Sequence, residues 1–144
     1  AGCFQEMIDL ETQSNGATEK KLRDSVITDM IIGSAIEVHQ TLGPGLLESV
    51  YESCLAYELV KAGCSVDRQK PLPVSYKGME LQEGFRLDLL VNDTVVVELK
   101  CVEKILPVHE AQLYTYLKLS GKHTGLLLNF YTKLLKDGIH RIVC

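Results

Sequence analysis

Three consecutive valines, residues 95–97, constrain the fold more than any other feature of this 144-residue chain. A β-branched run without a polar residue is typical of a strand that is buried on both faces. Glu98 and Lys100 then interrupt the same strand, and at positions i and i+2 they share one of its faces. The chain must therefore cover both faces of a sheet and still admit charge at one end of a buried strand.

Helical periodicity supplies the covering layers. Apolar residues recur at spacings of mostly three and four from about Glu19 to Leu42, which predicts a helix that ends at the glycine–proline–glycine break, residues 43–45. The apolar stripe of this helix is expected to contain Leu22, Val26, Met30, Ile31, Ala35 and Val38. Further helices are predicted over residues 46–62 and, opened by a proline and closed by a glycine, over residues 107–120.

The hydrophobic period changes to two after the second helix. Strands are predicted at residues 64–69, 72–77, 83–91, 95–100, 124–130 and 138–143. Pro71 and Pro73 place the first strands at the edge of the sheet. The order helix, helix, strands, helix, strand, strand predicts an α/β fold, a mixed sheet flanked by helices. Residues 1–17 are expected to form a flexible N-terminal tail, and residues 18–144 a single domain.

The turn before the valine run decides whether a second carboxylate joins Glu98. Asp88 lies on the preceding strand, ten residues earlier. A two-residue turn at Asn92-Asp93 would place Glu98 on the opposite face from Asp88. A three-residue turn over residues 92–94 would instead pair Asp88 with Glu98 and set Arg86 beside Lys100.

Paired carboxylates in a sheet call for a compensating charge. Directly opposite each other they repel, by roughly 3–4 kcal/mol at an effective dielectric constant near 20. A divalent cation between the two carboxylates makes the electrostatic energy of the group favourable, and oxygen ligands suit Mg²⁺ or Mn²⁺. Lys100 could then orient an attacking water or stabilise a charged transition state. The structural alternatives are an ordinary ion pair of Asp88 or Glu98 with Lys100, or solvated charges on an edge strand.

Further motifs resemble one known family. Residues 45–51 read Gly-Leu-Leu-Glu-Ser-Val-Tyr, which resembles the signature of the GxxExxY protein family, a group within the PD-(D/E)XK nuclease superfamily. The resemblance covers about residues 22–143. Segments that look like the same family, in the same order, are residues 37–39, 42–45, 76–78, 85–91, 97–100 and 111–112.

This resemblance implies a restriction-endonuclease-like core and assigns roles to individual residues. Asp88 and Glu98 would bind a divalent metal ion, and Lys100 would be the catalytic lysine. Glu48 would project from a helix into the site as a metal ligand or catalytic group. The structural alternative is that Glu48 only stabilises the first turn of the helix, where the helix dipole favours a carboxylate. Glu52 lies one turn further on, and in this alternative both residues belong to a solvated helix face.

Two residues of the third helix extend the resemblance. Gln112 and Tyr116 read QxxxY, which is similar to a motif of RecB-like and lambda-type exonucleases, and they lie on one helix face at i and i+4. They would serve catalysis and nucleic-acid binding, and Arg86 could contact a phosphate. The structural alternative is a hydrogen bond between the Gln112 amide and the Tyr116 hydroxyl inside the fold.

Charge and composition narrow the partners. A net charge of −4 argues against general electrostatic attraction to nucleic acid, so phosphate contacts would have to be local. No apolar run approaches the roughly 18–20 residues that span a bilayer. The five cysteines form no CxxC pair, which disfavours a zinc site and indicates free thiols in a reducing cytoplasm.

We therefore expect a cytoplasmic nuclease that depends on Mg²⁺ or Mn²⁺, acts on nucleic acid with DNA as the expected substrate, and has no membrane partner. One alternative is a catalytically silent module of the same fold that holds nucleic acid or a protein partner. Another is a structural protein such as a homo-oligomer subunit. A pure binding module has no reason to keep two repelling carboxylates, so the pair favours the enzyme.

Overall fold

The computed structural model describes the backbone of residues 2–144 and the side chains of residues 16–144. Its elements, in chain order, are α1 (Gly2–Leu42), α2 (Glu48–Lys61), β1 (Val66–Tyr76), β2 (Met79–Val91), β3 (Val95–Lys100), α3 (Pro107–Ser120), β4 (Thr124–Asn129), the short 3-10 helix η1 (Leu135–Gly138) and β5 (Ile139–Val143). Helices and strands thus follow the predicted order, and the α/β prediction is confirmed.

The five strands form one mixed sheet in the order β1-β2-β3-β4-β5. β3 and β4 run parallel, while the other three pairs are antiparallel. A parallel pair needs a crossover connection, and α3 provides it between β3 and β4. The valine run lies in β3, the middle strand, which explains why this segment is apolar on both sides.

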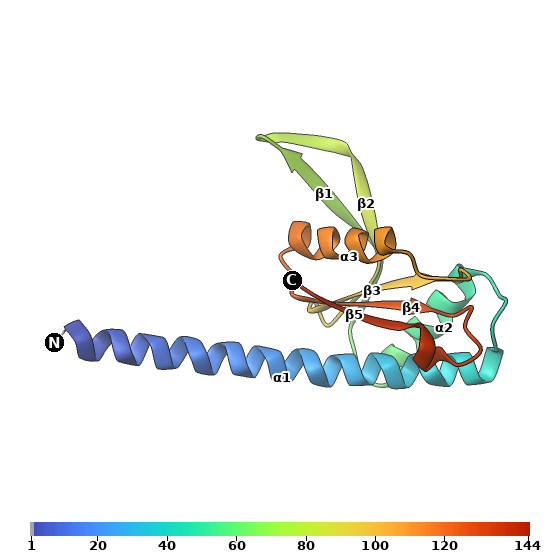
Figure 1. The fold of residues 1–144 in the computed structure, drawn as a ribbon, viewed down its shortest axis with the longest axis horizontal. Helices are drawn as coiled ribbons and strands as arrows, with labels where there is room; N and C mark the ends of the chain where they lie inside the picture. The colour runs from blue at the N-terminus through green and yellow to red at the C-terminus, as the bar shows by residue number, and fades with distance from the viewer. Residues whose placement is uncertain (1) are drawn as a thin grey trace.

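Each face of the sheet packs against its own helical layer (Figure 1). The larger core lies between the sheet and helices α1 and α2, and it includes Ile31, Tyr51, Leu55 and Phe130. A smaller core lies under α3 and is built around Leu113, Leu117, Leu90, Val96 and Leu127. Alternation along β3 therefore sends Val95 and Val97 to the first core and Val96 to the second.

Helix α1 departs from the prediction at its N-terminal end. It begins at Gly2, earlier than the predicted start near Glu19, and its first half extends beyond the sheet (Figure 1). The segment contains no proline, so no backbone N–H is missing from its helix, although Gly16 lowers the helix propensity. None of the helices in the described part of the chain is long and apolar enough to cross a membrane.

The buried stripe of α1 also differs from the predicted one. Leu22 and Val26 are 61% and 59% exposed, whereas Asp24, Ile27 and Ile31 are buried. Leu22 precedes Ile31 by nine residues, which is two and a half turns at about 3.6 residues per turn, so the two lie on opposite sides. Leu22 and Val26 were included in the predicted stripe because they are apolar, but both lie on the exposed side of the helix.

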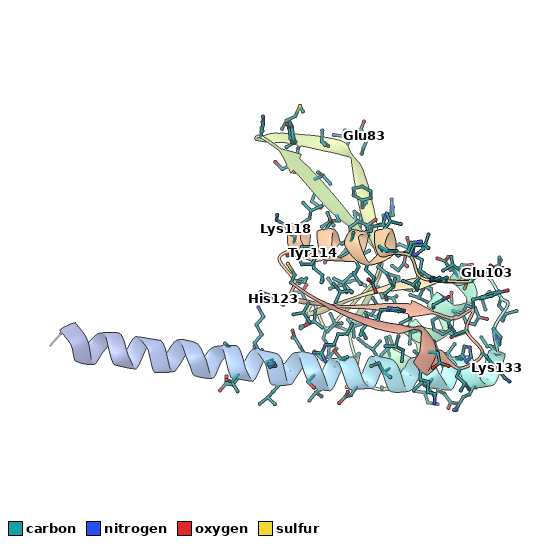
Figure 2. All side chains as sticks on the ribbon, viewed as in Figure 1. Glu83, Glu103, Tyr114, Lys118, His123 and Lys133 are labelled. Atoms are coloured by element: carbon teal, nitrogen blue, oxygen red, sulfur yellow. The ribbon has the colours of Figure 1, made fainter. Side chains whose placement is uncertain are left out.

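Strands β1 and β2 form a long ribbon. The two segments predicted at residues 64–69 and 72–77 are one continuous strand, β1, and its expected edge position is confirmed. β2 begins at Met79, earlier than predicted. The distal part of the ribbon, where Figure 2 labels Glu83, projects past α3 and away from the two cores.

Candidate active site

The turn between β2 and β3 has the register that brings Asp88 and Glu98 together. Val91 pairs with Val95 and Leu89 pairs with Val97 across a three-residue turn. Asn92 and Asp93 occupy the left-handed region, with φ of 51° and 53°, which their short polar side chains tolerate better than most. Of the two turns that the sequence left open, the observed register is the one that aligns the carboxylates.

Beyond Leu89 and Val97, the carboxylates replace the strand ladder. The Asp88 N–H donates to Glu98 Oε1 at 3.2 Å, and the Leu99 N–H donates to Asp88 Oδ2 at 2.9 Å. Each side chain therefore reaches the backbone of the opposite strand. The two carboxyl groups lie side by side at the point where β2 and β3 separate.

Arg86 does not reach the position expected for it. The ladder between β2 and β3 ends at Leu89 and Val97, so Arg86 does not pair with Lys100. Instead Arg86 is exposed, pairs with Pro71 of β1, and donates from Nη1 to the backbone oxygen of Gln69 at 3.3 Å. The cause is the carboxylate bonding, which opens the two strands before Arg86 is reached.

Burial makes Glu98 an unusual carboxyl group. Its residue is 8% exposed, and burial together with the neighbouring Asp88 raises the pKa of Glu98 from 4.5 to about 9. Lys100 lowers this pKa, but by less. In the metal-free protein Glu98 therefore holds its proton at neutral pH.

Neither structural alternative for this cluster fits. Among the side chains that the structure describes, Lys100 makes no direct ion pair with Asp88 or Glu98. β3 is the middle strand of the sheet and not an edge, so Glu98 is not a solvated charge. Glu98 is a carboxyl group at a depth where stability alone would favour an apolar residue.

The segment that resembles GxxExxY forms the loop and first turn before the site. Gly43 and Gly45 have φ of 73° and 101°, which glycine adopts without strain. Fully buried Tyr51 donates from its hydroxyl to the Gly43 oxygen at 2.5 Å, and its ring stacks on Phe130 at 4.5 Å. Its hydroxyl also accepts from the Leu46 N–H at 3.1 Å. These contacts fix where α2 begins.

Glu48 is the first residue of α2, and although the residue is exposed, its carboxyl group is partly desolvated. Burial raises the pKa of Glu48, Lys100 lowers it, and Asp88 raises it further. The Cys101 N–H, just after β3, lowers it as well. The carboxylate of Glu48 therefore interacts with both Lys100 and Asp88, which a residue placed only for the helix dipole would not do.

Gln112 and Tyr116 of α3 lie in different environments. Tyr116 is 7% exposed, and the pKa of its hydroxyl is raised by burial, then by Glu98 and Asp88, so it faces the carboxylates. Phe85 of β2 packs against its ring, with centroids 5.3 Å apart. Gln112, one turn earlier, is exposed. The structure thus places Tyr116 at the site and leaves Gln112 at the surface beside it.

Three residues next to the carboxylate cluster were not predicted from the sequence. Glu52 entered the sequence argument only through the alternative of a solvated helix face, but it is buried and forms an ion pair with Arg68 at 3.0 Å. Gln69 donates from its amide nitrogen to Glu52 Oε1 and to Asp88 Oδ1, the latter at 3.3 Å. The spacing of Glu48 and Glu52, one helical turn, was a usable signal for Glu52. Arg68 and Gln69 carried none, because β1 reads as an ordinary edge strand.

The donor chemistry of the cluster suits a hard divalent cation. Within the described side chains, no group of three or more His, Cys, Asp or Glu residues is already arranged to hold a metal ion. Asp88 and Glu98 nevertheless bring two carboxyl groups together, and Glu48 interacts with Asp88. All three residues offer oxygen ligands. A divalent cation could replace the proton of Glu98 and compensate the charge of its carboxylate. This donor set fits Mg²⁺ or Mn²⁺.

Comparison with known proteins places the chain in a family. Residues 25–142 match the family model described as the PD-(D/E)XK nuclease superfamily. No curated protein and no solved structure matches the chain. The matched region includes β1 to β4, all of β5 but its last residue, α2, α3 and the carboxylate cluster. The mixed sheet between helical layers is consistent with a restriction-endonuclease-like fold. The chain belongs to the PD-(D/E)XK nuclease superfamily.

Proposed function

We propose that the protein hydrolyses phosphodiester bonds in a reaction that depends on a divalent metal ion, with Mg²⁺ or Mn²⁺ as the cofactor and DNA as the substrate. The observation that carries the proposal is the pairing of half-buried Asp88 with buried Glu98 where β2 and β3 separate, with Lys100 two residues further along. The pair is costly to ionise fully, because burial and the neighbouring Asp88 both oppose a charge on Glu98.

Each residue then has a role that its position permits. Asp88, Glu98 and Glu48 would hold the metal ion, which when bound polarises a phosphoryl oxygen and lowers the pKa of a coordinated water. Lys100 would orient the attacking water or stabilise charge on the phosphate. The protonated hydroxyl of Tyr116, whose pKa is raised by burial first, would donate a hydrogen bond at the same face.

The finer family assignment is also a proposal. The loop that Tyr51 secures and the placement of Glu48 support a GxxExxY protein. The approach of Tyr116 to the carboxylates supports a relation to the RecB-like branch. In this proposal Gln112 and Arg86, both exposed, contact the phosphates that flank the scissile bond.

A cleavage assay with a matched pair of variants tests the proposal. Linear and circular DNA, single-stranded DNA and RNA are incubated with wild type, Asp88→Asn and Glu103→Gln, each in Mn²⁺, Mg²⁺ or EDTA. Glu103 is an exposed carboxylate just beyond β3, labelled in Figure 2, and serves as the control. We expect metal-dependent cleavage by wild type and Glu103→Gln, and at least a hundredfold loss in Asp88→Asn, because a charged ligand is removed.

Other results would support other functions. Binding of nucleic acid without cleavage in any metal would favour a silent module of the nuclease fold. A melting temperature that neither Mg²⁺ nor Mn²⁺ changes, together with absent cleavage, would favour a structural role, since a bound ligand stabilises the state that binds it.

A further inference from the structure

A bridge from α2 through β1 to the carboxylate cluster has no role in the proposal above. The Gln69 amide nitrogen donates to Glu52 Oε1 and, at 3.3 Å, to Asp88 Oδ1. Glu52 is held in turn by Arg68, whose Nη2 and Nε donate to Glu52 Oε2 at 3.0 and 3.3 Å. Arg68 Nη2 also donates to Ser53 Oγ at 2.8 Å. One side chain of β1 thus stands between two carboxylates that would otherwise repel.

The backbone of Gln69 is bent to make this bridge. Neighbouring residues of a regular strand face opposite sides of the sheet, yet Arg68 and Gln69 both reach the carboxylate of Glu52. Gln69 has φ of 50°, in the left-handed region that a residue with a long side chain rarely adopts. Strained backbone of this kind persists only where surrounding contacts hold it, and it concentrates at functional sites.

The bridge acts on the orientation of Asp88. With Leu99 N–H bound to Oδ2 and the Gln69 amide bound to Oδ1, both oxygens of this carboxylate are fixed by donors from different strands. A ligand that is already oriented loses less conformational freedom when the metal ion binds, and partners of this kind change metal affinity 10- to 100-fold in other sites.

We propose that Gln69 is a positioning residue, which holds Asp88 in the orientation that binds the metal ion and links it to α2 through Glu52. This inference deepens the proposed function and depends on its metal site. Gln69 does not touch the reacting atoms, so it should affect metal affinity before it affects the chemical step.

Two substitutions separate positioning from backbone structure. Gln69→Gly relieves the left-handed strain and removes the amide, and Gln69→Met keeps the length of the side chain without the amide. Gln82→Gly makes the same replacement at an exposed position of the projecting ribbon and serves as the matched control. Mn²⁺ affinity is measured by calorimetry, and folding by urea denaturation in EDTA.

We expect the Mn²⁺ dissociation constant to rise about tenfold in both Gln69 variants and to stay within about twofold in Gln82→Gly. Gln69→Gly should be no less stable than wild type in EDTA, because glycine adopts positive φ freely. Unchanged Mn²⁺ affinity in both Gln69 variants overturns the inference. If the wild-type protein binds no Mn²⁺, both the inference on Gln69 and the proposed metal site are overturned. A wild type that binds Mn²⁺ but cleaves nothing overturns the nuclease proposal alone, and the affinities still decide the role of Gln69.

Discussion

The two ends of β3 lie at similar depth but differ in chemistry. At the first end, residues 95–97 are fully buried valines that serve both cores. At the other end, Glu98 is 8% exposed and Lys100 is half-buried, so the carboxyl group is nearly as deep as the valines. Depth alone therefore does not explain why one end is apolar and the other carries charge.

The difference lies in the backbone. Over residues 95–97, β3 is paired with β2 on one side and β4 on the other, so its N–H and C=O groups are committed to two ladders. Beyond Val97 the ladder to β2 ends, and the N–H groups of Asp88 and Leu99 become donors to the two carboxylates. A buried carboxylate can be accommodated only where such donors are free. The site is found at the place where two strands separate.

The largest effect should come from placing a charge at the apolar end. Val96→Asp buries a carboxylate where the backbone N–H groups are already used, so we expect a loss of at least about 4 kcal/mol in the free energy of unfolding. Because Val96 packs in the apolar core under α3, Mg²⁺ should not recover the loss. Urea denaturation with EDTA and with Mg²⁺ measures both quantities. A loss below about 1 kcal/mol would mean that β3 opens more readily than its pairing indicates.

The next effect concerns Glu98 and pH. Its folded-state pKa of about 9 lies above the ordinary 4.5, so the folded protein binds this proton more tightly than the unfolded chain. The resulting stability is complete below pH 4.5 and is lost as the pH rises toward 9, by about 1.4 kcal/mol per pH unit. Glu98→Gln should remove this slope in EDTA and raise the melting temperature at pH 8, while cleavage falls.

Melting curves in EDTA from pH 5 to pH 9 test this prediction, with Glu103→Gln as the exposed control. The control should keep the slope of wild type. If Glu98→Gln and wild type show the same pH dependence, then Glu98 is ionised in the folded protein and its carboxylate already has a compensating partner.

The sequence predicted those parts of the molecule that depend on local pattern. The bounds of α3, the edge position of β1 and the shared face of Glu98 and Lys100 follow from proline, glycine and period-two rules, and all three are present. The hairpin register was narrowed to two choices, because turn length cannot be read from hydrophobicity alone. The structure decides it, since Val91 pairs with Val95 across the turn.

The parts that failed depend on contacts between distant segments. Glu52 was not predicted as a neighbour of the site, because its partner, Arg68, is sixteen residues away and on another element. Gln69 gave no signal, because an uncharged residue in an edge strand looks ordinary until its positive φ is seen. Arg86 was placed beside Lys100 by extending a ladder that the carboxylates interrupt.

A smaller effect is expected at Lys100. Lys100→Met preserves most of the apolar stem and removes the charge that lowers the pKa of Glu48 and Glu98. Since Glu98 is protonated at neutral pH and Lys100 makes no direct ion pair among the described side chains, the metal-free protein should lose only about 1 kcal/mol. Mg²⁺ should return much of this loss, but cleavage should remain low because water is no longer oriented. Wild-type cleavage rates in Lys100→Met would exclude a catalytic role for this residue.

The smallest effect separates the two residues of α3. Tyr116→Phe removes a hydroxyl that faces Glu98 and Asp88 but keeps the ring that packs on Phe85, so we expect a stability change below about 1 kcal/mol. Gln112→Ala removes an exposed side chain and should change stability still less.

Kinetics should distinguish these two variants where stability does not. If the Tyr116 hydroxyl acts beside the carboxylates, Tyr116→Phe lowers kcat, by roughly three- to tenfold for one hydrogen bond of about 0.5–1.5 kcal/mol. Gln112 lies at the surface one turn earlier and could reach only the flanking phosphates. The Gln112→Ala substitution should therefore raise KM and leave kcat unchanged. Steady-state rates on one DNA substrate at saturating Mn²⁺ measure both constants. A drop in kcat for Gln112→Ala that equals the drop for Tyr116→Phe would mean that the two residues act as a unit, and that α3 moves its exposed face toward the site when nucleic acid binds.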